Sequence, residues 1–218
     1  SLDITPLSDE VEMALVNQLV DSPSPLRRIE LENVIFTSYP GLRTPSSALI
    51  QVCLESYAEH VQPHEDGWKI KKDELPAARR RDLNEMENLL HDLGTRLGFE
   101  VKRRAPRGNI QISTWSTDEE TAYTFFSSAS GILAKLVLGQ PQPPPNPWIV
   151  LPGSRADLVA YKLSNNEPLA KLVEENWGFL KYRHLQRLAD DDSLTRANLA
   201  ERLSLDPLKY DAPQLPLI

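Results

Sequence analysis

The stretch from Leu97 to Lys162 constrains the fold of this chain more than any other. Short runs of β-branched and aromatic residues are separated there by turn residues, a pattern typical of strands. Gly98 is expected as the glycine that follows a helix end. The predicted order is a helix end that leads into a first strand (97–101), two further strands (110–115 and 122–128), a helix (130–138) and a last strand (148–155). This order predicts an α/β domain built on a sheet.

The residues before this stretch favour helices. Apolar spacing predicts helices over Asp9–Leu19, with Ser8 as N-cap, and over Leu26–Thr37. A third helix is expected from Pro45, capped by Thr44, to about His60. Residues 68–71 alternate like a short strand. Helix, turn, helix and strand are compatible with a winged-helix-like unit and equally with a plain helical cap.

A long amphipathic helix is predicted over Pro76–Leu97, with apolar residues at a period of 3.6. The proline-rich segment Gln140–Pro147 is expected to be a loop at the domain edge. The later elements are expected to be helices at 154–163, 168–176, 184–189 and 194–203, a strand at 177–183, and an extended tail at 210–218. We therefore divide the chain into an N-terminal helical part (1–75), an α/β core (76–190) and a C-terminal helix with tail (191–218).

Charge is unevenly distributed along the chain. The net charge is −7, which argues against nucleic-acid binding over the whole surface. Residues 69–107, however, hold eleven Lys and Arg against seven Asp and Glu, whereas residues 1–34 hold two against seven. The basic stretch is either a local face for an anionic partner or a solvated helix surface.

The sequence carries no membrane-spanning run and no secretion signal, because it lacks a long apolar stretch and a basic, apolar start. Its single cysteine, Cys53, lies in an apolar helical stretch and is interpreted as a small buried hydrophobe. A reducing cytoplasm fits this usage. The chain starts at Ser1 without a Met, which is compatible with a cloning remnant at Ser1 and with a fragment of a longer protein.

The segment Leu97–Arg155 resembles the PD-(D/E)XK, or restriction-endonuclease-like, superfamily. The resemblance lies in three motifs: Leu97-Gly98-Phe99 at the helix end, Tyr123–Ser128 as the third strand, and Ile149–Arg155 as the later strand. It implies a restriction-endonuclease-like α/β core. The segment from Tyr39 to Tyr57 is similar to regions found C-terminal to bacterial DNA methyltransferase domains, although the methyltransferase's own motifs are absent.

This sequence departs from the nuclease pattern at each position that carries the family's chemistry. Nucleases of this kind hold a divalent metal with carboxylates and use a lysine. The second strand, 110–115, has no acid, Phe126 stands where the strand carboxylate would be, and Ser128 stands where the lysine would be. The resemblance therefore implies no catalytic residue, no metal site and no cofactor. Acids that could have migrated are Glu100, Asp118, Glu119, Glu120 and Asp157.

Two histidine motifs are weak candidates for binding. His60 and His64 have the spacing of a zinc site only on a continuous helix, and Pro63 interrupts it. His184 lies in a basic stretch with Tyr182, which could contact phosphates or could simply be a surface helix. We predict no metal at either motif.

The leading hypothesis is a non-catalytic DNA-binding or DNA-positioning domain of a prokaryotic DNA modification or phage-defence system, whose partners are DNA and a larger modification or defence protein. The alternatives are a protein-interaction scaffold that docks through acidic ends, and an active nuclease with migrated acids. The predicted phosphate contacts form two groups about 30 Å apart, at opposite ends of the long helix: Arg79, Arg80 and Arg81, and then Lys102, Arg103, Arg104 and Arg107.

Overall fold

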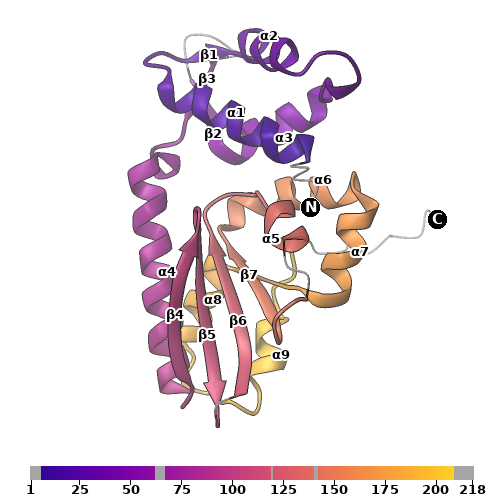
Figure 1. Cartoon of the computed structure of the whole chain (residues 1–218). Helices are drawn as coiled ribbons and strands as arrows, with labels where there is room; N and C mark the ends of the chain where they lie inside the picture. Colours follow the sequence, from indigo (N-terminus) through magenta and orange to yellow (C-terminus); the bar gives the residue numbers. More distant parts are fainter. Residues whose placement is uncertain (1–5, 62–66, 119, 140–141, 209–218) are drawn as a thin grey trace, which may run out of the picture.

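The structure is a computed structural model that describes residues 6–61, 67–118, 120–139 and 142–208. Helices and a small sheet form an N-terminal part, and a mixed sheet flanked by helices follows (Figure 1). The α/β class predicted from the sequence is confirmed. Among the described residues, none of the helices combines the length and the apolar character that a membrane span requires. The expected tail, 210–218, lies outside the described residues.

The N-terminal part contains three main helices and three short strands. In chain order these are α1 (Leu7–Asp21), β1 (Leu26–Arg27), α2 (Arg28–Ser38), η1 (Gly41–Arg43), α3 (Ser47–Tyr57), β2 (Ala58–His60) and β3 (Gly67–Ile70). The strands pair antiparallel in the order β1-β3-β2. The sequence predicted that residues 58–60 end a helix. They form the strand β2 instead.

Two predicted helix caps are wrong. Ser8 lies inside α1, which begins after Pro6. Ser46, and not Thr44, caps α3, because its hydroxyl accepts a hydrogen bond from the Leu49 amide at 3.2 Å. Both errors are shifts of two residues at a helix end, where local sequence defines the boundary least well.

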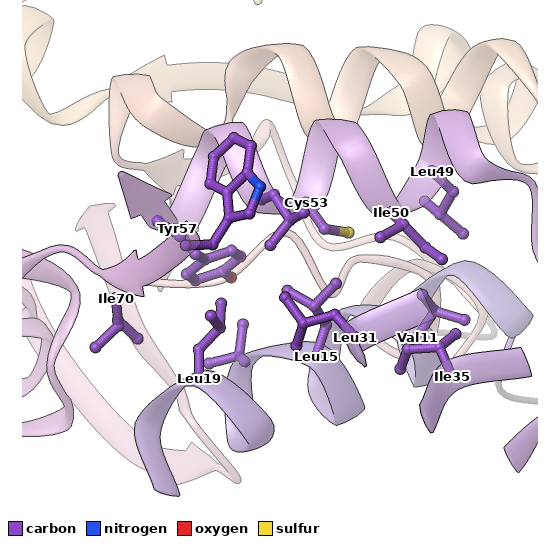
Figure 2. Packing of buried hydrophobic residues seen from close by; sticks show 14 of the residues in the cluster. Val11, Leu15, Leu19, Leu31, Ile35, Leu49, Ile50, Cys53, Tyr57 and Ile70 are labelled. Atoms are coloured by element: carbon purple, nitrogen blue, oxygen red, sulfur yellow. The ribbon is translucent and has the colours of Figure 1, made fainter. Parts of the chain in front are cut away.

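The three helices and the small sheet enclose their own apolar core. Side chains from α1, α2 and α3 point toward one another between the helices, as Figure 2 shows. Cys53 is buried there, as the sequence predicted, and burial raises the pKa of its thiol to about 12. The core also includes Leu158 of the C-terminal half, so this part is not closed off from the rest of the chain.

The second part is a sheet with the strand order β4-β5-β6-β7-β8. Strands β4, β5 and β6 form an antiparallel meander, and β7 and β8 run parallel to β6. Its elements are η2 (Lys72–Glu74), α4 (Pro76–Arg96), β4 (Glu100–Arg107), β5 (Ile110–Thr117), β6 (Glu120–Ser128), α5 (Ala134–Leu138), β7 (Pro147–Leu151), η3 (Gly153–Arg155), α6 (Ala156–Ser164), α7 (Glu167–Asn176), β8 (Gly178–Lys181), α8 (Tyr182–Asp190) and α9 (Leu199–Leu203).

Helices cover both faces of this sheet. One apolar cluster joins α4, α8 and α9 to the sheet face that carries Trp115 and Phe125. The other cluster joins α5, α6 and α7 to the face that carries Phe126. Adjacent strand residues point to opposite faces, so both phenylalanines are buried. The helix that we placed in a separate C-terminal segment contributes Leu199 and Leu203 to the first cluster.

Candidate nucleic-acid interface

The three arginines at the start of α4 have different surroundings. Arg79 is half-buried and lies over the ring of Tyr57, with its Cζ 5.7 Å from the ring centroid. Arg81 is exposed but lies 3.6 Å from the Asp82 carboxylate and 3.8 Å from that of Glu85. Arg80 is exposed and forms no ion pair with any described residue. Of this group, Arg80 keeps the most accessible charge.

Strand alternation separates the basic residues of β4. Arg103 faces α4, where its Nη2 donates to the side-chain oxygen of Asn88 at 2.8 Å and to the Glu87 carbonyl at 3.3 Å. Lys102 and Arg104 point to the other face. The Lys102 ammonium pairs with the Glu100 carboxylate at 2.8 Å. The predicted group of four is therefore not one cluster, and Arg103 mainly fastens β4 to α4.

Arg104 and Arg107 come together at the far end of β4. The register of β4 against β5 shifts between these two residues, as in a β-bulge. Both side chains are exposed, and neither forms an ion pair within the described ranges. Because β4 pairs only with β5 in the described sheet, these charges lie on an edge strand.

The two predicted groups are closer than 30 Å, because β4 runs back along α4 (Figure 1). Over eight residues β4 extends about 26 Å, and α4 is about 31 Å long. Gln111 donates to the side chain of Asn84 at 3.2 Å, and its neighbour Ile110 pairs with Arg107. Asn84 is one helical turn from Arg80. The expected separation is therefore wrong for Arg107, which lies near the start of α4, whereas Arg103 contacts residues midway along that helix.

A hollow of about 380 Å³ lies beside these arginines, on the sheet face opposite α4. Its floor includes Ile112 and Phe126, and prolines form part of its wall. The lining residues are Arg104, Ala105, Pro106, Arg107, Ile112, Thr124, Phe126 and Pro144. The hollow thus combines apolar surface with two arginine side chains.

The positions at which a nuclease would hold its metal carry other chemistry here. Phe126 packs against Trp177, with ring centroids 5.2 Å apart. Ser127 points to the opposite face, where its hydroxyl donates to the buried Glu87 carboxylate at 2.9 Å. The Ser128 hydroxyl contacts Ser130. Glu87 is therefore a carboxylate in direct contact with these strand positions, and nothing in the local sequence pattern pointed to it.

Burial raises the pKa of Glu87, although its hydrogen bond from Ser127 and the charge of Arg103 oppose the effect. No group of three His, Cys, Asp or Glu side chains could hold a metal ion among the described residues. Glu100 is exposed and paired with Lys102, and Asp118 is in the β5–β6 turn with φ 50°. Asp157 is exposed on α6. Glu119 and His64 lie outside the described residues.

The rings of His60 and His184 both contact other residues of the protein. The His60 ring packs on Trp68, with centroids 3.8 Å apart. His184 is buried, and its Nε2 lies 2.7 Å from the Arg202 carbonyl oxygen.

The acidic residues near the N-terminus are mostly paired. Asp9 and Glu12 are buried and bind the Lys162 ammonium, Asp9 at 2.6 Å. On the surface, Glu10 pairs with Arg43 at 2.6 Å, and Glu30 and Glu32 pair with neighbouring arginines. This leaves little accessible negative charge on the described part of this segment.

Arg155 is the centre of the contact between the two parts. It is fully buried, pairs with Glu74, and donates to the carbonyl and hydroxyl oxygens of Ser56 at 2.8 Å each. Its Nε also donates to the Ala129 carbonyl at 3.2 Å. All of these partners lie inside the protein, so the Arg155 side chain is fully engaged there.

Lys162 forms the second half of this contact. Besides Asp9 and Glu12, its ammonium donates to the Gly131 carbonyl at 3.0 Å. Burial alone would lower its pKa, but the two carboxylates outweigh burial and raise it. Burial raises the pKa of Asp9, against the charge of Lys162. Asp9 and Glu12 share a face of α1 with the buried Leu15, Val16 and Leu19. This helical spacing could have identified both carboxylates as inward-facing.

Comparisons with family models, with curated proteins and with solved structures found no match to this chain.

Proposed function

We propose that this chain is a non-catalytic DNA-binding or DNA-positioning module that serves a prokaryotic DNA modification or defence system. The observation that carries the proposal is the pair Arg104 and Arg107, exposed on the edge strand β4 near the start of α4. Neither has an ion-pair partner in the described part of the chain, so their charges are available for phosphates. Arg80 adds a third exposed positive charge near the same end of the molecule.

The order α4-β4-β5-β6-α5-β7 supports a restriction-endonuclease-like core, since it is the order that the resemblance implies. Phe126, Ser127 and Ser128 favour a core without nuclease chemistry. The link to modification or defence systems rests on the resemblance alone.

The N-terminal part supports a winged-helix-like interpretation through its order, helix, strand, two helices and two strands, and through its β1-β3-β2 sheet. In helix-turn-helix proteins the second helix of the motif enters the major groove. Here that helix would be α3, which has no Lys or Arg and packs against α6 and η3. We therefore assign DNA contact to β4 and not to α3.

Fluorescence anisotropy with labelled duplex DNA tests the proposal. We expect weak, sequence-tolerant binding that weakens as salt increases, because the contacts are to phosphates. Arg104→Ala and Arg107→Ala should each weaken binding and reduce the salt slope by about 1. Lys171→Ala, which removes one exposed charge from α7, is the matched control and should leave binding unchanged. No binding at low salt, or equal losses in all three variants, would contradict the proposal.

A plasmid assay with Mg²⁺ or Mn²⁺ tests the non-catalytic part of the proposal. We expect the plasmid to remain uncut, because the sheet positions discussed above carry no metal-binding set. Metal-dependent cleavage that is lost in Glu100→Ala or Asp157→Ala would show an active nuclease with migrated acids.

A protein-interaction scaffold is the second candidate function. The pairing of Glu10, Glu30 and Glu32 argues against docking through the acidic N-terminal end. The observation that favours a scaffold is instead apolar exposure on α2 and η1, where Ile29, Val34 and Leu42 lie on the surface. Absence of DNA binding in the anisotropy experiment would favour this candidate.

A further inference from the structure

We propose that the hollow beside Arg104 and Arg107 holds an unpaired base of single-stranded DNA, while the two arginines contact the adjoining phosphates. This inference rests on the proposed DNA-binding function and specifies the form of DNA that the site takes. Three observations carry it: the shape and lining of the hollow, a buried hydroxyl without a partner, and the position of the two charges.

The lining of the hollow suits a flat, mainly apolar group with polar edges. A volume of about 380 Å³ is in the range of small-molecule sites. Ile112 and Phe126 provide an apolar floor, and Pro106 and Pro144 provide apolar walls. The phosphate backbone of a duplex presents no apolar group that could enter such a hollow, whereas a single strand can turn a base outward.

The hydroxyl of Thr124 supplies the second observation. Thr124 lines the hollow and is only 3% exposed. Its Oγ1 is buried and has no hydrogen-bond partner among the described residues. A buried polar group without a partner costs free energy. Because Oγ1 has almost no solvent-accessible surface, a base must first displace the side chains that cover it. Its edge would then offer the donors and acceptors that this hydroxyl lacks.

The two arginines supply the third observation. Arg104 and Arg107 both line the hollow, so a base inside it would be flanked by positive charge. Guanidinium groups bind phosphate oxygens and also stack on bases. A nucleotide unit, with its apolar ring and adjoining phosphates, matches this combination of surfaces.

The test compares three labelled probes: a single strand, a duplex of the same sequence, and a single strand in which the central bases are abasic. The abasic strand keeps the phosphates and loses the bases. We expect the base-bearing strand to bind about fivefold or more tightly than the abasic strand. The duplex also offers the protein phosphates without free bases, at a higher charge density than the abasic strand, so its binding should not depend on the Thr124 hydroxyl.

Thr124→Val keeps the side-chain shape and removes the hydroxyl. It should weaken binding of the base-bearing strand by about two- to tenfold and leave binding of the abasic strand unchanged. Thr114→Val is the matched control: Thr114 is the cross-strand partner of Thr124, is also buried, and does not line the hollow. Thermal melts of both variants establish that they are folded.

Equal binding of the base-bearing and abasic strands would overturn this inference, and so would a Thr124→Val variant that binds like the parent. If duplex and single strand bind equally and both depend on Arg104, the proposed function stands and this inference is wrong. If no probe binds, both are wrong.

Discussion

The guanidinium of Arg155 lies over the ring of Tyr57, with its Cζ 3.5 Å from the ring centroid. Both side chains are completely buried. The Tyr57 hydroxyl donates to Glu12, which also accepts from Lys162 and from the Gly131 amide. One continuous polar network therefore joins α1 and α3 to the helix α6 of the core.

Replacing Arg155 should destabilise the protein strongly. Arg155→Met removes the contact with Tyr57 and leaves the Glu74 carboxylate buried without its cation, so we expect a loss of about 3–5 kcal/mol. Arg43→Met breaks an exposed pair with Glu10 and should cost less than about 1 kcal/mol. Urea denaturation of both variants measures the difference, and similar losses would contradict the role given to Arg155.

Glu87 should make stability depend on pH. Burial raises its pKa above the ordinary 4.5, so the folded protein holds this proton more tightly than the unfolded chain does. Its contribution is fully present below the unfolded pKa and is lost as pH rises through the folded pKa. Glu87→Gln should therefore lose less stability than the parent as the pH rises above the ordinary carboxyl pKa of 4.5.

Denaturation curves at several pH values measure this effect of Glu87. Glu85→Gln, an exposed carboxylate on the same helix, is the control and should keep the parent's profile. A parental profile in Glu87→Gln would show that another group controls the dependence.

Gly94 should not tolerate alanine, although alanine favours a helix by about 1 kcal/mol. A methyl group at Gly94 would lie 2.6 Å from Val101 and 2.7 Å from the Trp115 ring. We expect a net loss of about 1–3 kcal/mol from overpacking, seen as a lower melting temperature. Gly153→Ala, where no atom lies within 4 Å, is the control. A Gly94→Ala variant as stable as the parent would mean that α4 can move away from the sheet.

Phe125 and Phe126 should both be essential to stability, since they fill the cores on opposite sheet faces. Each alanine variant should lose about 3–5 kcal/mol. Leu42→Ala, at a fully exposed position, should change the free energy of unfolding by less than about 0.5 kcal/mol. If either phenylalanine variant unfolds like the Leu42 variant, the register of β6 is wrong.

Local patterns predicted the elements that have strong periodicity. The apolar residues of α4 gave its length to within one residue, and Gly98 has the φ of +78° expected after a helix end. The strands β5 and β6 followed from residue type and turns, whereas the first strand was predicted only as far as residue 101 and β4 runs to Arg107. The strands β1 and β2 were missed, because they have two and three residues and show no alternation.

Long-range pairing could not be predicted from one sequence. Lys162 and Asp9 are 153 residues apart in the chain, and Arg155 and Glu74 are 81 apart. Nothing local indicates that these charges meet. The return of β4 along α4 was missed for a related reason. The separation of the arginines depends on how the chain turns after Gly98, and helix length alone does not contain that information.

The network around Arg155 and Lys162 also divides its charges by origin. Its carboxylates, Asp9, Glu12 and Glu74, come from the first 75 residues, and its cations come from the core. The contact thus resembles the interface of a heterodimer whose subunits share one polypeptide. Cutting the chain after residue 75 would leave unpaired carboxylates in one fragment and unpaired cations in the other. The N-terminal part is therefore not a portable module, and it would need a matching cationic surface in any other protein that carried it.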